Sequence, residues 1–149
     1  MVIFKRYPSD LKKIPEIINE IFLKIKKYIN EDDLFNIRIS LLEALTNAIK
    51  HGNKFNRNLE VEVFLEIKKD KLIIKVHDKG EGFDYKNLKD PTEPNNLYKT
   101  SGRGIFLIKN FMDSVRFFDC GRGIEMVKSL KNRRANEDKG GEKGGYYNL

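Results

Sequence analysis

The chain has 149 residues, of which 40% are apolar, and carries 29 Lys and Arg against 22 Asp and Glu, a formal net charge of +7. This length and apolar content suit one domain with its own core. Charges of both signs are interleaved, so the basic balance does not indicate nucleic-acid binding, and we expect no direct nucleic-acid contact. With Cys120 as its one cysteine, the chain can form no internal disulfide, which favours a reducing cytosol.

The N-terminal residues, MVIFKRYPSD, contain an apolar run too short for a secretory signal. No stretch approaches the roughly 18 to 20 apolar residues that a membrane span needs. We therefore expect a soluble, cytoplasmic protein without a membrane partner.

The first third of the chain predicts a strand and two helices. Residues 2–7 have strand character and are closed by Pro8. Apolar residues spaced by three and four predict a helix from Leu11 to Ile29 and a second from Leu34 to Lys50. We expect Gly52 to provide a left-handed C-terminal cap for the second helix.

The middle of the chain predicts a β-hairpin followed by a long loop. Apolar and charged residues alternate in 59–67, and strand character resumes in 72–78 after the turn KKDK. The segment from Lys79 to Arg103 is irregular, with at most a short helix near 85–88. A loop of this length in a small domain is usually functional, often as a lid over a ligand.

The last third predicts a helix over 104–112 and two strands over 114–120 and 123–130, with a turn at GR. The tail from residue 131 is polar and Gly-rich, and we expect it to be disordered. The predicted domain spans 1–130. Strands and helices do not alternate regularly, so we predict an α+β fold: a two-layer sandwich with a mainly antiparallel sheet covered by helices.

The second helix carries two polar residues on one face. At about 100° per residue, with Glu43 at zero, Asn47 falls near 40° and His51 near 80°. The predicted core stripe lies on the other side and consists of Leu34, Ile37, Leu41, Leu45 and Ala48. Taken alone, a Glu and an Asn four residues apart are more typical of a solvated helix face than of a site.

The segment HDKGEGF places a carboxylate and two glycines at a predicted strand end. Asp78 can accept a hydrogen bond from an exocyclic amine such as that of adenine. Gly80 and Gly82 can adopt positive φ and let the backbone approach a ligand. An ordinary Asp/Gly turn is the alternative.

The segment SGRGIF leads from glycines into a predicted helix. Unpaired N–H groups at a helix N-terminus suit phosphates, and Lys99 and Arg103 can add positive charge. The alternative for Gly102 and Gly104 is a lid hinge, and the segment is not a Walker motif because no Gly-Lys-Ser/Thr follows.

The three motifs together, in this order and separated by a lid, resemble the Bergerat-type (GHKL) ATP-binding fold of histidine kinases, type II topoisomerases, heat-shock and mismatch-repair ATPases. The compact form with Glu43 in the helix motif is similar to the anti-sigma-factor serine-protein kinases. The resemblance runs from Tyr7 to Leu130 and includes NFMDSV after the last glycine pair.

This resemblance implies a role for each motif. Asn47 would offer its amide oxygen to Mg²⁺, Glu43 would act as the general base on a serine or threonine hydroxyl, and Asp78 would bind adenine. The implied ATP-binding set is Asn47, His51, Asp78, Gly80, Gly82, Phe83, Lys99, Thr100, Ser101, Gly102, Arg103, Gly104 and Ile105.

The resemblance also implies partners. A kinase of this kind holds an RNA polymerase sigma factor inactive and phosphorylates an anti-anti-sigma (STAS-domain) antagonist. It further implies a homodimer.

Three positions depart from the family pattern. Thr100 stands where an Arg commonly precedes Ser-Gly-x-Gly, and Ile124 stands where the family often has Thr after Gly123. Arg103 replaces the usual hydrophobic residue between the glycines. These changes concern the phosphate side and the adenine side of the implied site.

Two other functions remain open from the sequence. A non-catalytic ATP-binding partner-switching module fits the altered positions, although Glu43 has no purpose in a mere binder. A small GHKL ATPase, with Glu43 activating water, is disfavoured because the chain lacks a second domain to transmit hydrolysis. A histidine-kinase fragment is disfavoured because Asn usually stands where Glu43 does.

Overall fold

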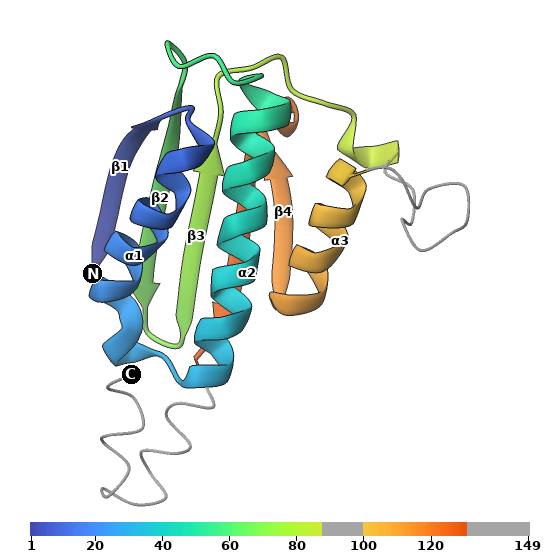
Figure 1. Cartoon of the computed structure of the whole chain (residues 1–149). Coiled ribbons are helices and arrows are strands. Elements are labelled where there is room, and N and C mark those ends of the chain that lie inside the picture. The colour runs from blue at the N-terminus through green and yellow to red at the C-terminus, as the bar shows by residue number, and fades with distance from the viewer. Residues whose placement is uncertain (88–99, 131–149) are drawn as a thin grey trace, which may run out of the picture.

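A computed structural model describes residues 1–87 and 100–130, which form one five-stranded sheet with helices packed on one face (Figure 1). The strand order is β1-β2-β3-β5-β4, and every neighbouring pair is antiparallel. The strands are β1 (Val2–Pro8), β2 (Glu60–Lys68), β3 (Lys71–His77), β4 (Ser114–Phe118) and β5 (Gly123–Ser129). The predicted α+β sandwich and its β2–β3 hairpin are confirmed.

Three α-helices belong to the described residues: α1 (Ile14–Ile25), α2 (Glu31–Asn47) and α3 (Thr100–Phe111). Short 3₁₀ turns flank α1 at Leu11–Lys13 and Lys26–Tyr28, so the predicted first helix is one α-helix with two tightened ends. None of the helices in residues 1–87 and 100–130 is long and apolar enough to cross a membrane.

The second helix begins earlier than predicted because Asn30 caps it. The Asn30 side chain accepts a hydrogen bond from the Asp33 N–H at 2.8 Å, and three acidic residues follow in the first turn. A capping side chain and first-turn carboxylates satisfy the free N–H groups and the dipole of a helix start.

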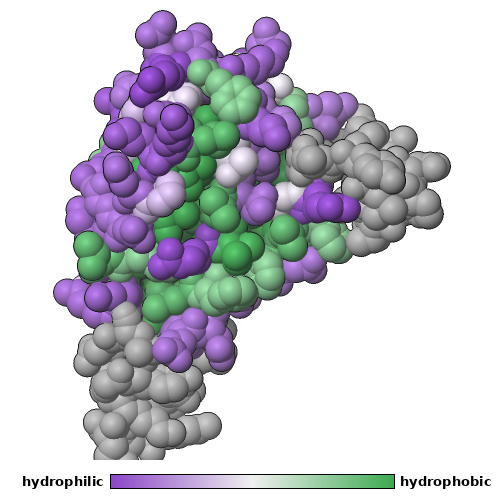
Figure 2. Space-filling view, viewed as in Figure 1, coloured by the Kyte–Doolittle hydropathy of each residue, from purple (hydrophilic) through white to green (hydrophobic). Residues whose placement is uncertain are grey.

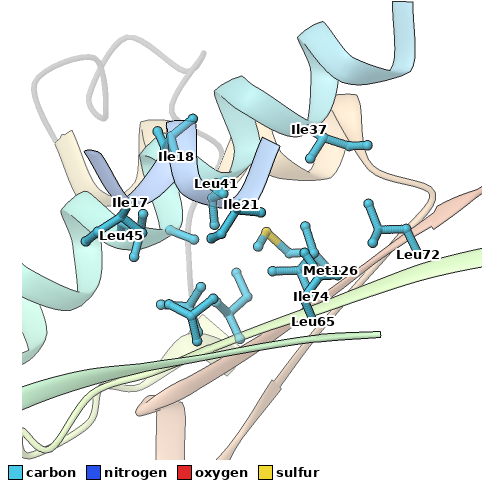
Figure 3. Packing of buried hydrophobic residues seen from close by; sticks show 14 of the residues in the cluster. Ile17, Ile18, Ile21, Ile37, Leu41, Leu45, Leu65, Leu72, Ile74 and Met126 are labelled. Atoms are coloured by element: carbon cyan, nitrogen blue, oxygen red, sulfur yellow. The ribbon is translucent and has the colours of Figure 1, made fainter. Parts of the chain in front are cut away.

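The core lies between the helices and the sheet (Figure 3). Leu65, Ile74 and Met126 face one another across β2, β3 and β5 and are fully buried. Isoleucines of α1 and the apolar face of α2 close over them, as Figure 3 shows for Ile21 and Leu41. The predicted stripe of α2 is buried at Ile37, Leu41, Leu45 and Ala48, whereas Leu34 is only partly buried.

The outer surface of the helical layer is mixed. Figure 2 shows an apolar band across this face, bordered by polar side chains. On the helices, Leu23 and Phe35 stay more than half exposed. Elsewhere among the described residues the same holds for Val2 and Phe4 of β1 and for Phe55, and Phe83 is also exposed.

Several boundaries in the second half of the chain differ from the prediction. The strand predicted over 114–120 ends at Phe118, and Asp119–Gly121 form a 3₁₀ turn. The helix predicted over 104–112 begins at Thr100. The short helix predicted near 85–88 is a 3₁₀ turn at Tyr85–Asn87. Most of the predicted lid, 88–99, and the predicted disordered tail, 131–149, lie outside the described residues.

Candidate functional site

A cavity of about 140 Å³ opens at one end of the sandwich, between α2, α3 and the strand ends of β3 and β5. Its walls are mainly apolar, with a small number of polar side chains. The lining residues are Ala44, Asn47, Ala48, His51, Gly52, Val76, Asp78, Gly82, Phe83, Ile105, Phe117, Gly121, Arg122, Gly123 and Ile124. Apolar walls with few polar groups are typical of small-molecule sites.

Asn47 stands where α2 changes its winding. The α-helix ends at Asn47 and continues as a π-helical turn, Ala48–Gly52, in which the Asn53 N–H donates to the Ala48 carbonyl at 2.8 Å. π-turns of this kind are frequent at functional sites. The wider turn replaces the regular helix that the apolar spacing predicts up to Lys50.

The prediction that Gly52 takes a left-handed conformation is wrong. Positive φ occurs instead at Lys54 and Phe55, at 51° and 63°. Gly52 is required for a different reason: a Cβ there would lie 2.2 Å from Oδ2 of Asp78. The absent side chain lets the π-turn lie directly against the Asp78 carboxylate.

Asp78 follows β3 and is 6% exposed. Its Oδ1 accepts a hydrogen bond from the Gly80 N–H at 2.8 Å, and its own N–H donates to the Arg122 carbonyl at 2.9 Å. Burial raises the pKa of this carboxyl, while the hydrogen bond from Gly80 acts in the opposite direction. The geometry holds an acceptor group rigidly in the wall of an apolar cavity.

Gly80 and Gly82, the two glycines after Asp78, have different structural roles. Gly82 has φ of 82°, as predicted, whereas Gly80 does not share this conformation. A Cβ on Gly80 would lie 2.0 Å from the Gly52 carbonyl oxygen. Gly80 therefore permits close packing of the loop against the π-turn, and the prediction of positive φ at Gly80 is wrong.

Asn53 connects these loops and was not identified from the sequence. It is 2% exposed, and its Oδ1 accepts a hydrogen bond from the Lys79 N–H at 2.8 Å. Its Nδ2 donates to Ser9 Oγ at 2.8 Å and to the Glu60 carbonyl at 3.2 Å. An Asn in a polar stretch carries no distinguishing pattern, so only the tertiary contacts reveal that Asn53 fixes the loop after β3.

Glu43 and Asn47 meet the glycine motif of α3. A Cβ on Gly104 would lie 2.7 Å from Glu43 Oε2 and 3.3 Å from Asn47 Nδ2. Glu43 is half-buried and lies one turn before Asn47, beside the cavity wall. The polar face of α2 is therefore covered by α3 and is not a solvated face.

The glycine pair lies inside α3 and does not precede it. The helix starts at Thr100, so Gly102 and Gly104 occupy its first turns, which differs from the predicted entry into a helix at Gly104. Gly104 allows α3 to approach α2 closely, as its distance to Glu43 shows.

The structure brings most of the other predicted site residues to this end of the fold. His51 and Phe83 line the cavity and are exposed, and Ile105 lines it and is buried. Burial and the neighbouring Lys50 lower the pKa of His51. Arg103 is exposed on α3, the backbone of Thr100 and Ser101 begins that helix, and Lys99 lies outside the described residues.

An aromatic group beside the cavity was missed by the sequence analysis. Phe117 contacts Phe83 edge-to-face, with ring centroids 5.4 Å apart, and stacks on Tyr85 at 5.0 Å. Phe117 projects from β4, which pairs with β5 next to Ile124. The alternating pattern of SVRFF indicated a strand, but could not show which side faces a cavity.

Residues 5–128 match the family model described as the histidine kinase-like ATPase domain. The chain belongs to this family of ATP-binding domains, and its closely matching relatives are protein serine kinases. It is 35% identical over 115 residues to the serine-protein kinase RsbW of Staphylococcus aureus strain MSSA476, and equally to that of strain MW2, covering 72% of each chain.

A solved structure supports the fold. The catalytic domain of the histidine kinase ThkA superposes with a TM-score of 0.50 at 14% identity, covering 84% of this chain and 92% of that one. The family model and the RsbW relatives confirm the resemblance of the three sequence motifs to GHKL serine-protein kinases and the protein kinase class.

Proposed function

We propose that this protein binds Mg-ATP in the cavity and transfers the γ-phosphate to a serine or threonine hydroxyl of a partner protein. The observation that carries the proposal is the buried carboxylate of Asp78 in the wall of an apolar cavity that also contains Asn47. Glu43 lies one helical turn from Asn47.

The enclosed part of the cavity suits the adenine base. Its volume of about 140 Å³ is below the roughly 300–1,000 Å³ of pockets that bury a whole drug-sized ligand. The base would lie between Val76 and Ile124 on the sheet side and Ile105 on the helix side. Asp78 would accept the hydrogen bond of the exocyclic amine, which demands an acceptor.

Asn47 is the residue that we propose to hold Mg²⁺. The described residues contain no group of three or more His, Cys, Asp or Glu that could hold a metal ion by themselves. Mg²⁺ does not need such a group, because it usually takes one or two protein ligands and completes its shell with phosphate oxygens and water. The metal supplies charge neutralisation on the phosphates when it is bound.

Glu43 is the proposed general base. It would accept the proton of the attacking hydroxyl, which raises the nucleophilicity of that oxygen toward the γ-phosphate. The contact of Gly104 with both Glu43 and Asn47 supports this arrangement, since it brings the start of α3 to the carboxylate. The first-turn N–H groups of α3 are suited to the phosphates.

We propose that the phosphorylated partner is a STAS-domain anti-anti-sigma protein and that the chain also binds a sigma factor. The support is the similarity to RsbW serine-protein kinases and the order of the three motifs. A homodimer acting in the cytoplasm belongs to the same proposal.

The test is calorimetry of ATP binding, with and without Mg²⁺, on wild type, Asp78→Asn and Asn47→Ala. We expect Mg-ATP binding by wild type, no detectable binding by Asp78→Asn, and loss of mainly the Mg²⁺ dependence in Asn47→Ala. Absence of adenine-nucleotide binding by the wild-type protein contradicts the proposal.

The catalytic part has its own test. With a STAS-domain protein as substrate, Glu43→Gln should bind Mg-ATP as wild type does and transfer phosphate about 10²–10⁴-fold more slowly, the usual contribution of a general base. Wild-type rates of partner switching in this variant would instead identify a non-catalytic ATP-binding module. Hydrolysis without transfer would identify a small ATPase.

A further inference from the structure

The turn between β4 and β5 has an unusual backbone. Asp119, Cys120 and Gly121 have φ values of 50°, 54° and 85° in succession. Left-handed conformations of non-glycine residues are costly and persist only where the surroundings hold them. Contacts around this turn must therefore stabilise it.

This turn is one wall of the cavity. Gly121, Arg122 and Gly123 line it. The Cys120 carbonyl accepts a hydrogen bond from the Phe83 N–H at 3.1 Å, and a Cβ on Gly82 would lie 2.1 Å from the same oxygen. A displacement of the turn would consequently displace the Gly82–Phe83 segment that faces it.

His77 contacts the turn from β3. Its Nε2 lies 2.8 Å from Asp119 Oδ2, and its ring stacks on Phe118, with centroids 5.6 Å apart. The Phe118 ring in turn covers Gly123, where a Cβ would lie 2.3 Å from it. The second nitrogen, Nδ1, lies 3.4 Å from Glu62 Oε1 on β2.

His77 lies behind the cavity and not in it. Successive side chains of a strand point to opposite faces. Val76 and Asp78 line the cavity, so His77 between them faces the other side, where it meets Glu62 of β2. The imidazole cannot touch a ligand bound against Asp78.

We propose that His77 is a positioning residue: its contact with Asp119 holds the left-handed turn Asp119–Gly121 and thereby shapes the wall against which the adenine base binds. The inference rests on the proposed function in taking adenine as the occupant of the cavity. It adds a residue on the far face of the sheet to the determinants of nucleotide affinity.

Carboxylates flank both ring nitrogens of His77. Glu62 and Asp119 face the imidazole, and Lys79 and Arg6 pair with Glu62 while Arg122 pairs with Asp119. The imidazole therefore bridges β2 and the turn, whereas the adjacent Asp78 lies on the opposite face.

Adenosine is the probe, because it has the base and lacks the phosphates, which would bind elsewhere in the site. Its affinity is measured by calorimetry for the full chain, His77→Ala, His77→Gln and Lys75→Ala. We expect His77→Ala to weaken binding about three- to tenfold, the effect of one hydrogen bond. His77→Gln should recover most of the affinity, because the Gln amide can donate a hydrogen bond to Asp119.

A control on the same strand separates this effect from a general loss of surface contacts. Lys75 lies two residues earlier on the same face of β3, and Lys75→Ala should leave the affinity unchanged. An equal loss of affinity in Lys75→Ala and His77→Ala, or no loss in His77→Ala, would overturn the assignment.

Amide hydrogen exchange tests, without any ligand, whether His77 holds the turn Asp119–Gly121. The Phe83 N–H reports the contact with Cys120, and the Asp78 N–H reports the contact with Arg122. Both should exchange about three- to tenfold faster in His77→Ala than in Lys75→Ala. Unchanged exchange in His77→Ala would overturn the role of His77, even if the protein binds ATP. Faster exchange in His77→Ala, in a protein that binds no nucleotide, would contradict the proposed function and leave the role of His77 in the turn intact.

Discussion

The two ends of the helix–sheet sandwich are built on different principles. In the core, Leu65, Ile74 and Met126 form a cross-strand row under two amphipathic helices, within one cluster of buried apolar side chains. At the cavity end, a π-turn, a buried carboxylate and a left-handed turn lie together. Many similar apolar contacts stabilise the core, whereas the shape of the cavity depends on the positions of a few groups, such as the Asp78 carboxylate. Stability and nucleotide binding should therefore respond to different substitutions.

The largest effect on stability should come from the core. Ile74 is fully buried on the central strand, and Ile74→Ala should lower the free energy of unfolding by about 2–5 kcal/mol, because it removes apolar contacts and leaves a cavity. Urea denaturation measures the change. Leu23→Ala is the control, because Leu23 is 69% exposed and its loss should cost less than about 0.5 kcal/mol. Equal losses would contradict the assigned core.

Adding a single methyl group at Gly52, beside the cavity, should strongly weaken ATP binding. Gly52→Ala places a Cβ 2.2 Å from Asp78 Oδ2, so the π-turn or the carboxylate must move, at a cost of about 1–3 kcal/mol. We expect ATP affinity to fall at least about tenfold, measured by calorimetry. Lys50→Ala, on the exposed side of the same turn, should bind ATP as wild type does. Wild-type affinity in Gly52→Ala would show that Asp78 is not the base acceptor.

Asp78 itself should show a conflict between stability and function. Burial raises its pKa in the folded protein, so its contribution to stability is fully present below the unfolded pKa and is lost as the pH rises through the folded pKa. Asp78→Asn should therefore be more stable than wild type at pH 7, by less than about 2 kcal/mol, while it binds no ATP.

A pH series of urea denaturation checks this sign. The advantage of Asp78→Asn should be smallest at acidic pH, where the wild-type carboxyl is protonated, and should grow as the pH rises. Burial also raises the pKa of Asp33, but Asp33 is present in both proteins and its contribution cancels in the difference. A variant less stable than wild type at pH 7 would show that the carboxylate is well compensated.

The smallest effect should come from a surface ion pair. Lys13 and Glu16 lie 3.8 Å apart on α1 and its preceding turn, with side chains 47% and 75% exposed. Glu16→Gln should change the free energy of unfolding by less than about 0.5 kcal/mol and leave ATP affinity unchanged. A loss of stability as large as that of Ile74→Ala would show that surface pairs contribute to this fold as much as the core does.

Much of the fold and part of the site could be predicted from local patterns. The period-two alternation of β2 and β3 and the three-four spacing of α1 and α2 depend on neighbouring residues, because helix and strand geometry repeat over short distances. The same reasoning put Glu43 and Asn47 on one face and Asp78 at a strand end. The likeness of the three motifs to a known family placed them in one site.

The tertiary structure alone decided what these residues contact. Gly52 and Gly80 were expected to provide special backbone angles, but their role is to let two loops touch. Asn53, Phe117 and His77 had no distinguishing local pattern, because their partners lie 6 to 44 residues away. Such contacts exist only after the sheet has brought distant segments together. The elements and the chemistry of the motifs follow from neighbouring residues, whereas the cavity and the turns that shape it depend on long-range packing.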